Sequence, residues 1–386
     1  MKLLLFGFTK RFYETKRNTP SRFLSRPRPA SAGLVSGASP SPALAGNKDP
    51  YRIWLSEIML QQTRIEAVIP YYHRFLAEAP TVARLAALDD ERLMKLWEGL
   101  GYYSRARNLK RAALTVMESH GGALPPDFSA LRRLPGIGDY TAGAISSIAF
   151  GLPEPAVDGN VLRVLMRLTG REDDIAAAAT KKAVTEWLRA IYPTGDAAGE
   201  LTEGLMELGE HICLPAGQPK CEVCPWRERC AANREGRQTD LPKKSPKKEK
   251  RSEEYTVLLL VAGDRVALQK RPDSGLLAGL WEFPNLPGKR SDAEVEAFLR
   301  EQGVSPLSVS PDTEATHVFT HVTWHMRGVL VRVTEPFGHF SWFSADDLRA
   351  HVAVPTAFRA YVKSVGDALG REDAEDAGTR RTRGMR

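Results

Sequence analysis

Apolar residues recur at every third or fourth position over most of the stretch from Asp49 to about Arg237, which is the period of amphipathic helices. Runs typical of strands are nearly absent from this stretch. The pattern therefore predicts an all-α region. The predicted helices cover Tyr51–Leu60, Ile65–Ala77, Asp90–Trp97, Ala106–Ser119, Tyr140–Phe150, Val161–Leu168 and Lys181–Ile191.

The period changes to that of strands after a charged segment, residues 238–254, whose two prolines and six basic residues are typical of a solvated linker. Beyond it, two alternating stretches flank Ala262-Gly-Asp264 as a hairpin. We expect a small α+β domain over residues 255–369, a helical domain over 49–237, and a charged tail over 370–386. The predicted strands are Tyr255–Val261, Arg265–Gln269, Glu314–Thr320 and Arg327–Val333, with helices at Asp292–Gln302 and Phe358–Ala368.

Length and charge limit the classes of function. The 386 residues suffice for two or three domains, each with its own core. No apolar run approaches the roughly 20 residues that span a bilayer. The formal net charge of +7 favours a polyanionic partner.

All four cysteines fall within one short segment, in the pattern C-x7-C-x2-C-x5-C. No other cysteine exists to pair with them, so a disulfide framework is implausible and a reducing compartment is expected. Four thiolates in one compact loop favour a cubane iron–sulfur cluster, and a structural zinc ion is the alternative. The candidate ligands are Cys213, Cys221, Cys224 and Cys230.

A glycine-containing turn, Leu134-Pro-Gly-Ile-Gly-Asp-Tyr-Thr-Ala-Gly-Ala144, lies between two predicted helices. Gly136 and Gly138 permit a tight hairpin that exposes backbone amides at the start of the next helix, where a phosphate binds without base contacts. The alternative is a simple turn between helices, for which one glycine would suffice. The spacing favours a helix-hairpin-helix for non-sequence-specific DNA binding.

Further features carry possible chemistry or mark the start of a helix. Glu57 stands within a strongly apolar helix, so burial should raise its pKa; a rise from the usual value to near neutrality requires roughly 2.7 kcal/mol of differential burial. Thr63 and Glu66 predict a capping box for the following helix. Asp158 precedes an apolar helix and is either its N-cap or a carboxylate facing a bound DNA backbone. The stretch Gly99–Leu109 combines glycines, tyrosines and arginines, a composition suited to a wedge in a base stack.

Together, the runs SEIMLQQT, GLGYYSRARNL, LPGIGDYTAGA and VDGNVLRV and the cysteine loop resemble the A/G-specific adenine DNA glycosylases (the MutY family) of the endonuclease III superfamily. The resemblance covers about residues 48–370. It implies one 4Fe–4S cluster and double-stranded DNA with an 8-oxoguanine:A or G:A mispair as substrate. It also implies a base-excision-repair enzyme that acts as a monomer in the bacterial cytoplasm, without membrane contact.

The resemblance also implies roles for individual residues. Glu57 corresponds to the general acid toward adenine and Asp158 to the carboxylate that stabilises the sugar cation, with Tyr140 and Asn160 completing the catalytic candidates. Tyr140 occupies the position where bifunctional relatives carry a lysine nucleophile, so the enzyme is expected to be monofunctional. Gln62 and Tyr102 correspond to the residues that wedge into the duplex around the lesion, and the other expected DNA-binding residues are Gly136, Gly138, Phe319, Thr320 and His321.

The C-terminal domain resembles the Nudix fold, on the run Gly279-Leu-Trp-Glu-Phe-Pro284. The catalytic run R-E-x-x-E-E of that fold is missing, since Lys289–Glu296 cannot supply its metal-binding carboxylates. The domain is therefore expected to recognise 8-oxoguanine through Phe319-Thr-His321, with Thr320 where serine is usual. A nucleotide pyrophosphohydrolase is disfavoured for the same reason, and Tyr140 disfavours a glycosylase/lyase for oxidised pyrimidines.

Two departures from the family pattern concern the cysteine loop and the N-terminus. Seven residues separate the first two cysteines where six are usual, an insertion that a surface loop tolerates. The family's Leu-Pro-Trp-Arg stretch, which helps to line the adenine pocket, is absent ahead of Asp49. Residues 1–48 have the composition of a transit peptide. We favour an altered reading frame or start over organelle targeting, and expect weak packing and an adenine pocket incomplete on one wall; an inactive DNA-binding relative stays an alternative.

Overall fold

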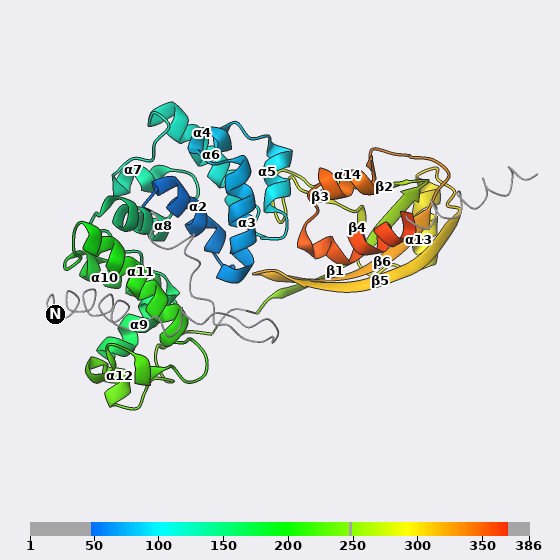
Figure 1. Cartoon of the computed structure of the whole chain (residues 1–386). Helices are drawn as coiled ribbons and strands as arrows, with labels where there is room; N and C mark the ends of the chain where they lie inside the picture. The colour runs from blue at the N-terminus through cyan, green and yellow to red at the C-terminus, as the bar shows by residue number, and fades with distance from the viewer. Residues whose placement is uncertain (1–47, 247–248, 370–386) are drawn as a thin grey trace, which may run out of the picture. The chain divides into compact units, whose positions relative to one another are not determined.

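The computed structural model describes residues 48–246 and 249–369 (Figure 1). The contacts within the chain form two compact units. The described part of the first comprises residues 48–87 and 107–246, and that of the second comprises residues 88–106 and 249–369. The expectations for residues 1–47 and for the tail from residue 370 lie outside the described residues.

The first unit is helical, and its described residues contain no strand, as the hydrophobic period predicts. Two helices continue into π-helical turns, Ile145–Ala149 after α8 and Leu208–Ile212 after α11. Such turns are common at functional sites. The α-helices are α2 (Pro50–Leu60), α3 (Ile65–Glu78), α4 (Val82–Ala86), α6 (Ser104–Ser119, most of which belongs to this unit), α7 (Phe128–Arg133), α8 (Asp139–Ala144), α9 (Gly159–Thr169), α10 (Ala178–Arg189), α11 (Asp196–Glu207) and α12 (Ala231–Arg234).

Helix α2 is buried along most of its length. It begins after Asp49, whose side chain accepts hydrogen bonds from the backbone amides of Tyr51 and Arg52. The capping box predicted at the next helix is wrong. The N-cap of α3 is Arg64, without a side-chain cap, and the Thr63 hydroxyl instead donates to the carbonyl of Gln61 at 3.4 Å. The helix starts one residue later than the box requires.

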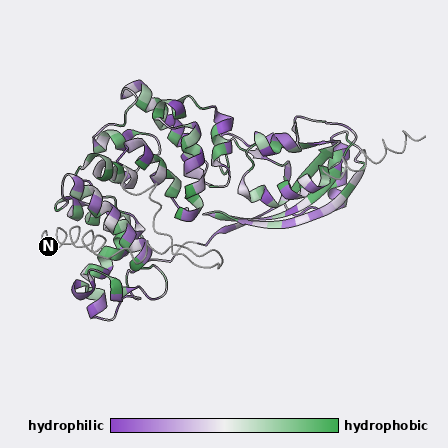
Figure 2. Cartoon of the chain, in the orientation of Figure 1, coloured by the Kyte–Doolittle hydropathy of each residue, from purple (hydrophilic) through white to green (hydrophobic). Residues whose placement is uncertain are grey.

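One core of the first unit surrounds α9, whose apolar face packs against α10 and α11. Figure 2 shows this mixture of apolar and polar faces on the helices. The cysteine loop lies against the same core, because Cys213, Cys224 and the buried Trp226 belong to it. The cysteine loop therefore rests on the helix that begins at Asp158.

The second unit is built on a seven-stranded sheet, in the order β3-β2-β1-β6-β5, with β4 beside β1 and β7 beside β2. Strands β1 and β6 are parallel, and the other pairs are antiparallel. The elements are α5 (Asp90–Trp97), β1 (Arg251–Ala262), β2 (Arg265–Lys270), β3 (Trp281–Glu282), β4 (Asn285–Pro287), α13 (Asp292–Glu301), β5 (Ser308–Val318), β6 (Val322–Arg332), β7 (Ser341–Ser344), α14 (Ala345–Ala350) and helical residues 359–369.

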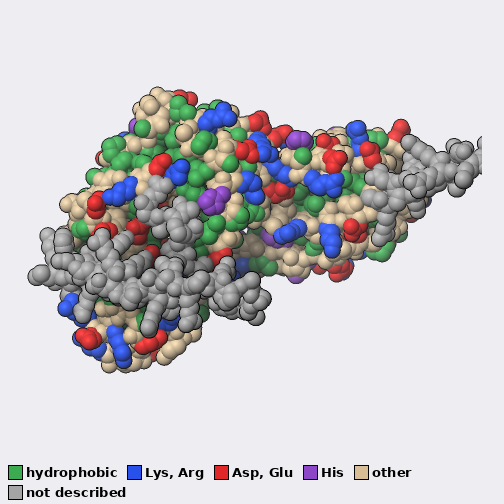
Figure 3. Space-filling view, viewed as in Figure 1, with side chains coloured by type: hydrophobic (Ala, Val, Ile, Leu, Met, Phe, Trp, Pro, Cys, Tyr) green, Lys and Arg blue, Asp and Glu red, His purple; other side chains and the backbone are tan. Residues whose placement is uncertain are grey.

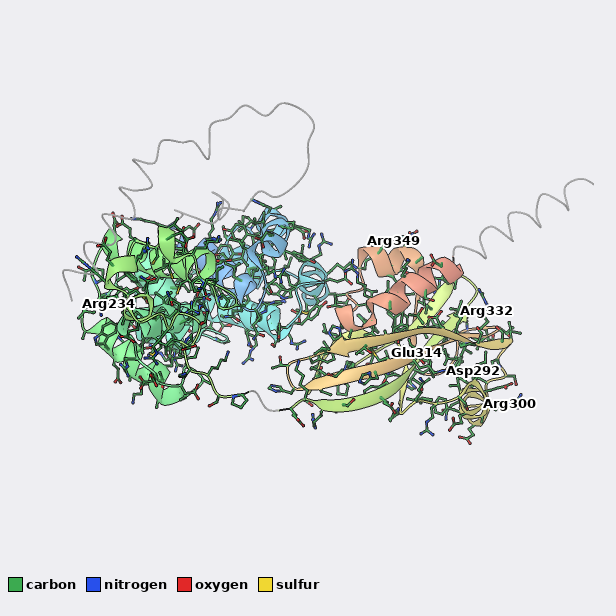
Figure 4. The ribbon with its side chains drawn as sticks, turned by 90° about the horizontal axis from the view of Figure 1, so that it is seen from below. Arg234, Asp292, Arg300, Glu314, Arg332 and Arg349 are labelled. Carbon is green, nitrogen blue, oxygen red and sulfur yellow. The ribbon has the colours of Figure 1, made fainter. Side chains whose placement is uncertain are left out.

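The sheet is covered on both faces, because alternate residues of β1 enter two different cores. Val257 and Leu259 pack with the C-terminal helix, while Leu258 and Leu260 pack with α13. Figure 4 shows the same layers, with Asp292 and Arg300 on α13 at one side of the sheet and Arg349 on α14 at the other. The predicted α+β fold is confirmed, and it places the Phe319–His321 turn between β5 and β6.

Strand β1 begins earlier than its alternating pattern predicted. Residues 251–254 were assigned to the linker because they are charged, yet they pair with residues 322–325 of β6. The backbone of these residues supplies the pairing while their side chains remain exposed or half-buried. The sheet thus extends to the end of the Phe319–His321 turn, whose His321 carbonyl accepts a hydrogen bond from the Arg251 amide at 3.1 Å.

Candidate active site

Glu57 is a buried carboxyl group on α2, with 8% of its surface exposed. Its pKa is raised from 4.5 to about 7, mainly by burial; the negative charges of Asp158 and Glu203 contribute to this rise, and a hydrogen bond from Tyr140 opposes it. The raised pKa expected from the apolar helix is therefore found. A carboxyl group with such a pKa carries a proton for part of the time at neutral pH and can donate it.

Tyr140 lies at the start of α8, where its hydroxyl contacts the carboxyl group of Glu57. Burial raises the pKa of Tyr140 well above its ordinary value, and the charges of Glu57 and Asp158 raise it further. The tyrosine therefore stays a neutral hydrogen-bond donor. Its hydroxyl also lies 3.6 Å from the sulfur of Met206 on α11.

Asp158 is both the N-cap of α9 and part of the site. Its Oδ1 accepts a hydrogen bond from the Val161 amide at 2.8 Å, and its Oδ2 accepts one from Asn160 Nδ2 at 3.0 Å. The N-cap interpretation of this residue is confirmed, and the capping geometry fixes the carboxylate whose charge raises the pKa of Glu57. Asn160 therefore orients the carboxylate of Asp158, because its side-chain amide donates to Oδ2.

A glycine in α8 brings the segment that carries Asp158 close to this helix. A Cβ atom on Gly143 would lie 2.4 Å from the carbonyl oxygen of Pro155, closer than any side chain tolerates. Residues 155–157 therefore run directly against α8 and lead into Asp158. The small residues of the hairpin motif thus help to assemble the two carboxyl groups as well as to form the turn.

The network continues from Asp158 to the cysteine loop through buried side chains of α9. The Oδ1 atom of Asn160 accepts a hydrogen bond from Arg163 Nη2 at 2.9 Å, and Arg163 Nε donates to the carbonyl of Cys213 at 2.8 Å. Arg167 Nη1 donates to the sulfur of Cys213 at 3.3 Å and to the carbonyl of Leu214 at 2.8 Å. Both arginines are at most 7% exposed. The candidate site and the cysteine loop therefore share one hydrogen-bond network.

The four cysteines line a single pocket together with Val164, Leu208, Ile212 and Trp226. Among the described residues, no three His, Cys, Asp or Glu side chains lie close enough together to hold one metal ion. Burial raises the pKa of Cys224 to about 11 and also raises the pKa values of Cys221 and Cys230. The four thiols therefore line one pocket, with the buried guanidinium of Arg167 beside the sulfur of Cys213.

The two residues expected to wedge into DNA have strained backbones. Gln62 has φ 58° and Tyr102 has φ 46°, and only one other non-glycine residue of the described chain, Leu277, has a positive φ. Each such residue costs about 1–3 kcal/mol, and such strain clusters at functional sites. Tyr102 is also 46% exposed, which is unusual for a large aromatic side chain. Gln62 lies in the first unit and Tyr102 in the second.

The hairpin of the first unit has the geometry that its glycines predict. Gly136 has φ +76°, and a Cβ atom there would lie 2.7 Å from Asn108 Cβ. Gly138 is the N-cap of α8, and a Cβ atom there would meet nothing within 4 Å. Gly138 is therefore exposed at the start of α8.

In the Phe319–His321 turn of the second unit, Phe319 packs inward, whereas Thr320 and His321 face solvent. The ring of Phe319 packs edge-on against His317 and Trp324, with centroid distances of 4.5 and 4.8 Å. Thr320 and His321 are exposed. The Thr320 hydroxyl lies 3.2 Å from the hydroxyl of Tyr102. Two of the expected DNA-binding residues, distant in sequence, thus meet within this unit.

Sequence reasoning missed three residues of the site. Glu203 lies on an ordinary amphipathic helix, α11, and its effect on Glu57 arises only from the fold. Arg163 and Arg167 read as the polar positions of an apolar helix, yet both are buried. Their spacing of four residues, one helical turn, was the available signal, because it places both side chains on one face of α9.

No helix among the described residues is long and apolar enough to cross a membrane. Figure 3 shows basic side chains interspersed with acidic ones over the face that it presents, so the net positive charge is distributed rather than gathered in one patch on that face.

Comparison with known proteins gives two domain matches. The model of the HhH-GPD superfamily of base excision DNA repair proteins matches residues 55–190, and that of the NUDIX domain matches residues 256–364. Among solved structures, a thermostable thymine-DNA glycosylase is 29% identical with a TM-score of 0.44, and the match covers 49% of this chain and 87% of that one.

Curated relatives match over most of the chain. The adenine DNA glycosylase of Buchnera aphidicola subsp. Acyrthosiphon pisum is 32% identical over 289 residues, which cover 74% of this chain and 81% of that protein. The adenine DNA glycosylase of Homo sapiens is 33% identical over 375 residues, which cover 81% of this chain and 68% of the human protein.

Proposed function

Because the chain belongs to the adenine DNA glycosylase family, we propose that it hydrolyses the N-glycosidic bond of adenine mispaired with 8-oxoguanine or guanine in double-stranded DNA. The products are free adenine and an abasic site. The observation that carries this proposal is the pair formed by Glu57, whose pKa is raised to about 7, and the fixed carboxylate of Asp158. One group can donate a proton at neutral pH while its neighbour supplies negative charge.

The proposed reaction begins with the adenine outside the base stack, because a base within a duplex cannot reach a buried carboxyl group. Glu57 donates its proton to a ring nitrogen of adenine, which makes the base a better leaving group. Positive charge then develops on the sugar, and the carboxylate of Asp158 stabilises it. Asn160 and the Val161 amide hold this carboxylate in place, and water completes the hydrolysis.

We propose that the enzyme is monofunctional. Cleavage of the abasic strand by β-elimination starts from an amine that attacks the sugar, and the lysine of bifunctional relatives is replaced here by Tyr140. The tyrosine hydroxyl contacts Glu57 and remains neutral, so it positions the acid rather than attacking the substrate. A glycosylase/lyase acting on oxidised pyrimidines is the weaker candidate for this reason.

We further propose that Cys213, Cys221, Cys224 and Cys230 hold one 4Fe–4S cluster. The apolar pocket that they line and the donor from Arg167 to Cys213 support this assignment. When bound, the cluster supplies a covalent staple for the loop that carries Lys220, Arg227 and Arg229. We assign the chemistry to Glu57 and Asp158, and to the loop the task of presenting positive charge to the DNA backbone.

Recognition of 8-oxoguanine is assigned to Thr320 and His321 together with Tyr102. Their exposure and the contact between the Tyr102 and Thr320 hydroxyls support this proposal, since both side chains can then reach one base. Phe319 supports the turn from below by packing against Trp324.

The test is a single-turnover glycosylase assay on duplexes that contain 8-oxoguanine:A, G:A or thymine glycol. We expect excision of adenine, fastest opposite 8-oxoguanine, and no excision of thymine glycol. The variant Glu57→Gln should bind the mispair and fail to excise. Residual excision within tenfold of the unmodified protein, equal to a loss of about 1.4 kcal/mol, would remove Glu57 from the acid role.

A further inference from the structure

Residues 88–106 belong by their contacts to the second unit, although they lie within the range matched by the base-excision-repair family. Helix α5 occupies the first part of this segment, and the turn that carries Tyr102 follows it. The second unit therefore combines residues 88–106 with the C-terminal part of the chain. Two charged side chains of this segment, Lys95 and Glu98, contact α14 and the residues that follow it. Both side chains are largely shielded from solvent.

Lys95 and Glu98 on and after α5 bind the backbone of residues 348–354. Lys95 Nζ donates to the carbonyls of Leu348 and Val352, both at 2.9 Å, and forms an ion pair with Glu98 at 2.7 Å. Glu98 Oε1 accepts a hydrogen bond from the Val354 amide at 2.9 Å. We call this set of bonds the latch. Its polar partners come from two distant parts of the sequence.

The latch supplies hydrogen-bond partners to backbone groups of residues 348–354 that lie outside regular secondary structure or at the end of a helix. Leu348 lies in the last turn of α14, where carbonyl groups lack the amide that a longer helix would supply. Residues 352–354 belong to neither a helix nor a strand, while the side chains of Val352 and Val354 are buried in the core. Lys95 keeps only 15% of its side chain exposed. Hydrogen bonds from a charged group at such a site are stronger than those between neutral groups.

A rigid turn connects the latch to Tyr102. Trp97 Nε1 donates to the carbonyl of Gly101 at 3.1 Å. Arg105 Nη2 donates to the carbonyls of Leu100 and Gly101, at 3.0 and 3.1 Å, and its guanidinium lies 5.7 Å from the ring centre of Tyr102. A displacement of α5 would therefore move Tyr102 with it.

The Phe319–His321 turn is fixed from the other side by the sheet and by Lys250, whose Nζ donates to the carbonyl of Phe319 at 2.9 Å. The hydroxyls of Tyr102 and Thr320 meet at 3.2 Å between these two supported segments. Neither strand pairing nor a shared helix joins the segments, so their alignment depends on how α5 is attached.

We propose that Lys95 and Glu98 are positioning residues for recognition of the base opposite adenine: the latch aligns Tyr102 with Thr320 so that both reach 8-oxoguanine. This inference rests on the proposed function, because it needs an enzyme that prefers 8-oxoguanine:A to G:A. The latch touches neither the substrate nor the carboxyl groups of the active site. Its loss should therefore alter the choice of mispair and leave the chemistry unchanged.

The experiment compares full-length Lys95→Met with the unmodified protein in single-turnover excision from 8-oxoguanine:A and G:A duplexes. Methionine retains the apolar stem and removes the three bonds of the ammonium group. We expect the preference for 8-oxoguanine to fall at least fivefold, with the G:A rate constant within twofold of its original value. Lys95→Arg, which retains donors for the two carbonyls, should restore at least half of the preference. Lys363→Met, at an exposed lysine of the same unit, is the matched control and should change nothing.

Hydrogen exchange at residues 352–354 supplies a readout independent of activity. Glu98→Gln and Lys95→Met should both accelerate exchange of the Val354 amide, whereas Lys363→Met should not. A Lys95→Met protein that keeps its full preference would overturn the inference and leave the proposed function intact. Equal losses on both duplexes would also overturn it, since the latch would then serve folding alone. An unmodified enzyme without any preference for 8-oxoguanine would overturn the proposed function and the inference with it.

Discussion

Replacement of Glu57 by glutamine should stabilise the protein at alkaline pH while abolishing excision. The folded chain raises the pKa of this carboxyl group from 4.5 to about 7, mainly through burial. Between these two values the unfolded chain releases the proton while the folded chain retains it. The free energy of unfolding therefore falls as the pH rises from about 4.5 through 7, because only the unfolded chain gains the free energy of releasing the proton to water.

The magnitude follows from the raised pKa. A change of one in a pKa is worth about 1.36 kcal/mol, so burial of this carboxyl group costs about 3 kcal/mol at pH 8 and about 1 kcal/mol at pH 5. Glutamine has nearly the same shape and no charge to bury, and its oxygen can still accept the bond from Tyr140. We therefore expect Glu57→Gln to gain about 2 kcal/mol relative to the unmodified protein between pH 5 and pH 8. For a unit of this size, that corresponds to a relative rise in Tm of roughly 4–8 °C.

The assay is thermal unfolding of both proteins, prepared anaerobically, followed by circular dichroism at pH 5 and pH 8. Only the difference between the two proteins is used, so that all other titrating groups cancel. Glu186→Gln, at an exposed carboxyl group of α10, is the control and should show no pH-dependent difference. A Tm difference between Glu57→Gln and the unmodified protein that is the same at pH 5 and at pH 8 would refute the reasoning. Glu57 would then titrate normally and could not serve as the acid near neutral pH.

Three further expectations concern the cluster, the abasic product and Asn160. Anaerobically purified protein should contain about four irons with matching sulfide, and stoichiometric zinc instead would contradict the cluster. Borohydride should trap no covalent adduct between the enzyme and abasic DNA, whereas efficient trapping would show that an amine attacks the sugar. Asn160→Ala should lower the excision rate about tenfold, equal to the loss of one hydrogen bond to a charged group, with mispair binding unchanged. An unaltered rate would mean that the Val161 amide alone orients Asp158.

Much of the fold was predictable because local chemistry and burial agree along most of the chain. The observed bounds of α5 equal the predicted ones, and the predicted hairpin pairs Ala262 with Arg265. The failures occur where tertiary contacts decide. Residues 251–254 look like linker, but the parallel partner strand extends over them. The predicted capping box at Thr63 fails, and the adjacent Gln62 adopts a left-handed conformation.

Without the family resemblance, the candidate site was predictable mainly for the residues whose chemistry conflicts with their surroundings. A glutamate in an apolar helix and four clustered cysteines are conspicuous in any sequence. Glu203 is an acidic residue on an amphipathic helix, as many others are, and acquires a role only when α11 brings it near Glu57. The sequence likewise does not predict that α5 belongs to the second unit, because Lys95 and Glu98 resemble ordinary surface residues at a short helix.

The hydrogen bonds of α9 connect the cysteine loop to Asp158, so the position of the loop would affect the proposed catalysis without any chemistry at the proposed cluster. Asp158 is oriented by Asn160, Asn160 is bound by Arg163, and Arg163 is held by the carbonyls of Cys213 and Gly209. The bond to the Cys213 carbonyl requires the loop to stay in place against α9. The proposed cluster, by fixing Cys213, would also fix Arg163 and, through two further bonds, the carboxylate of Asp158, to which we assign stabilisation of the sugar cation. The loop's position would thus affect excision even where its basic residues still bind DNA.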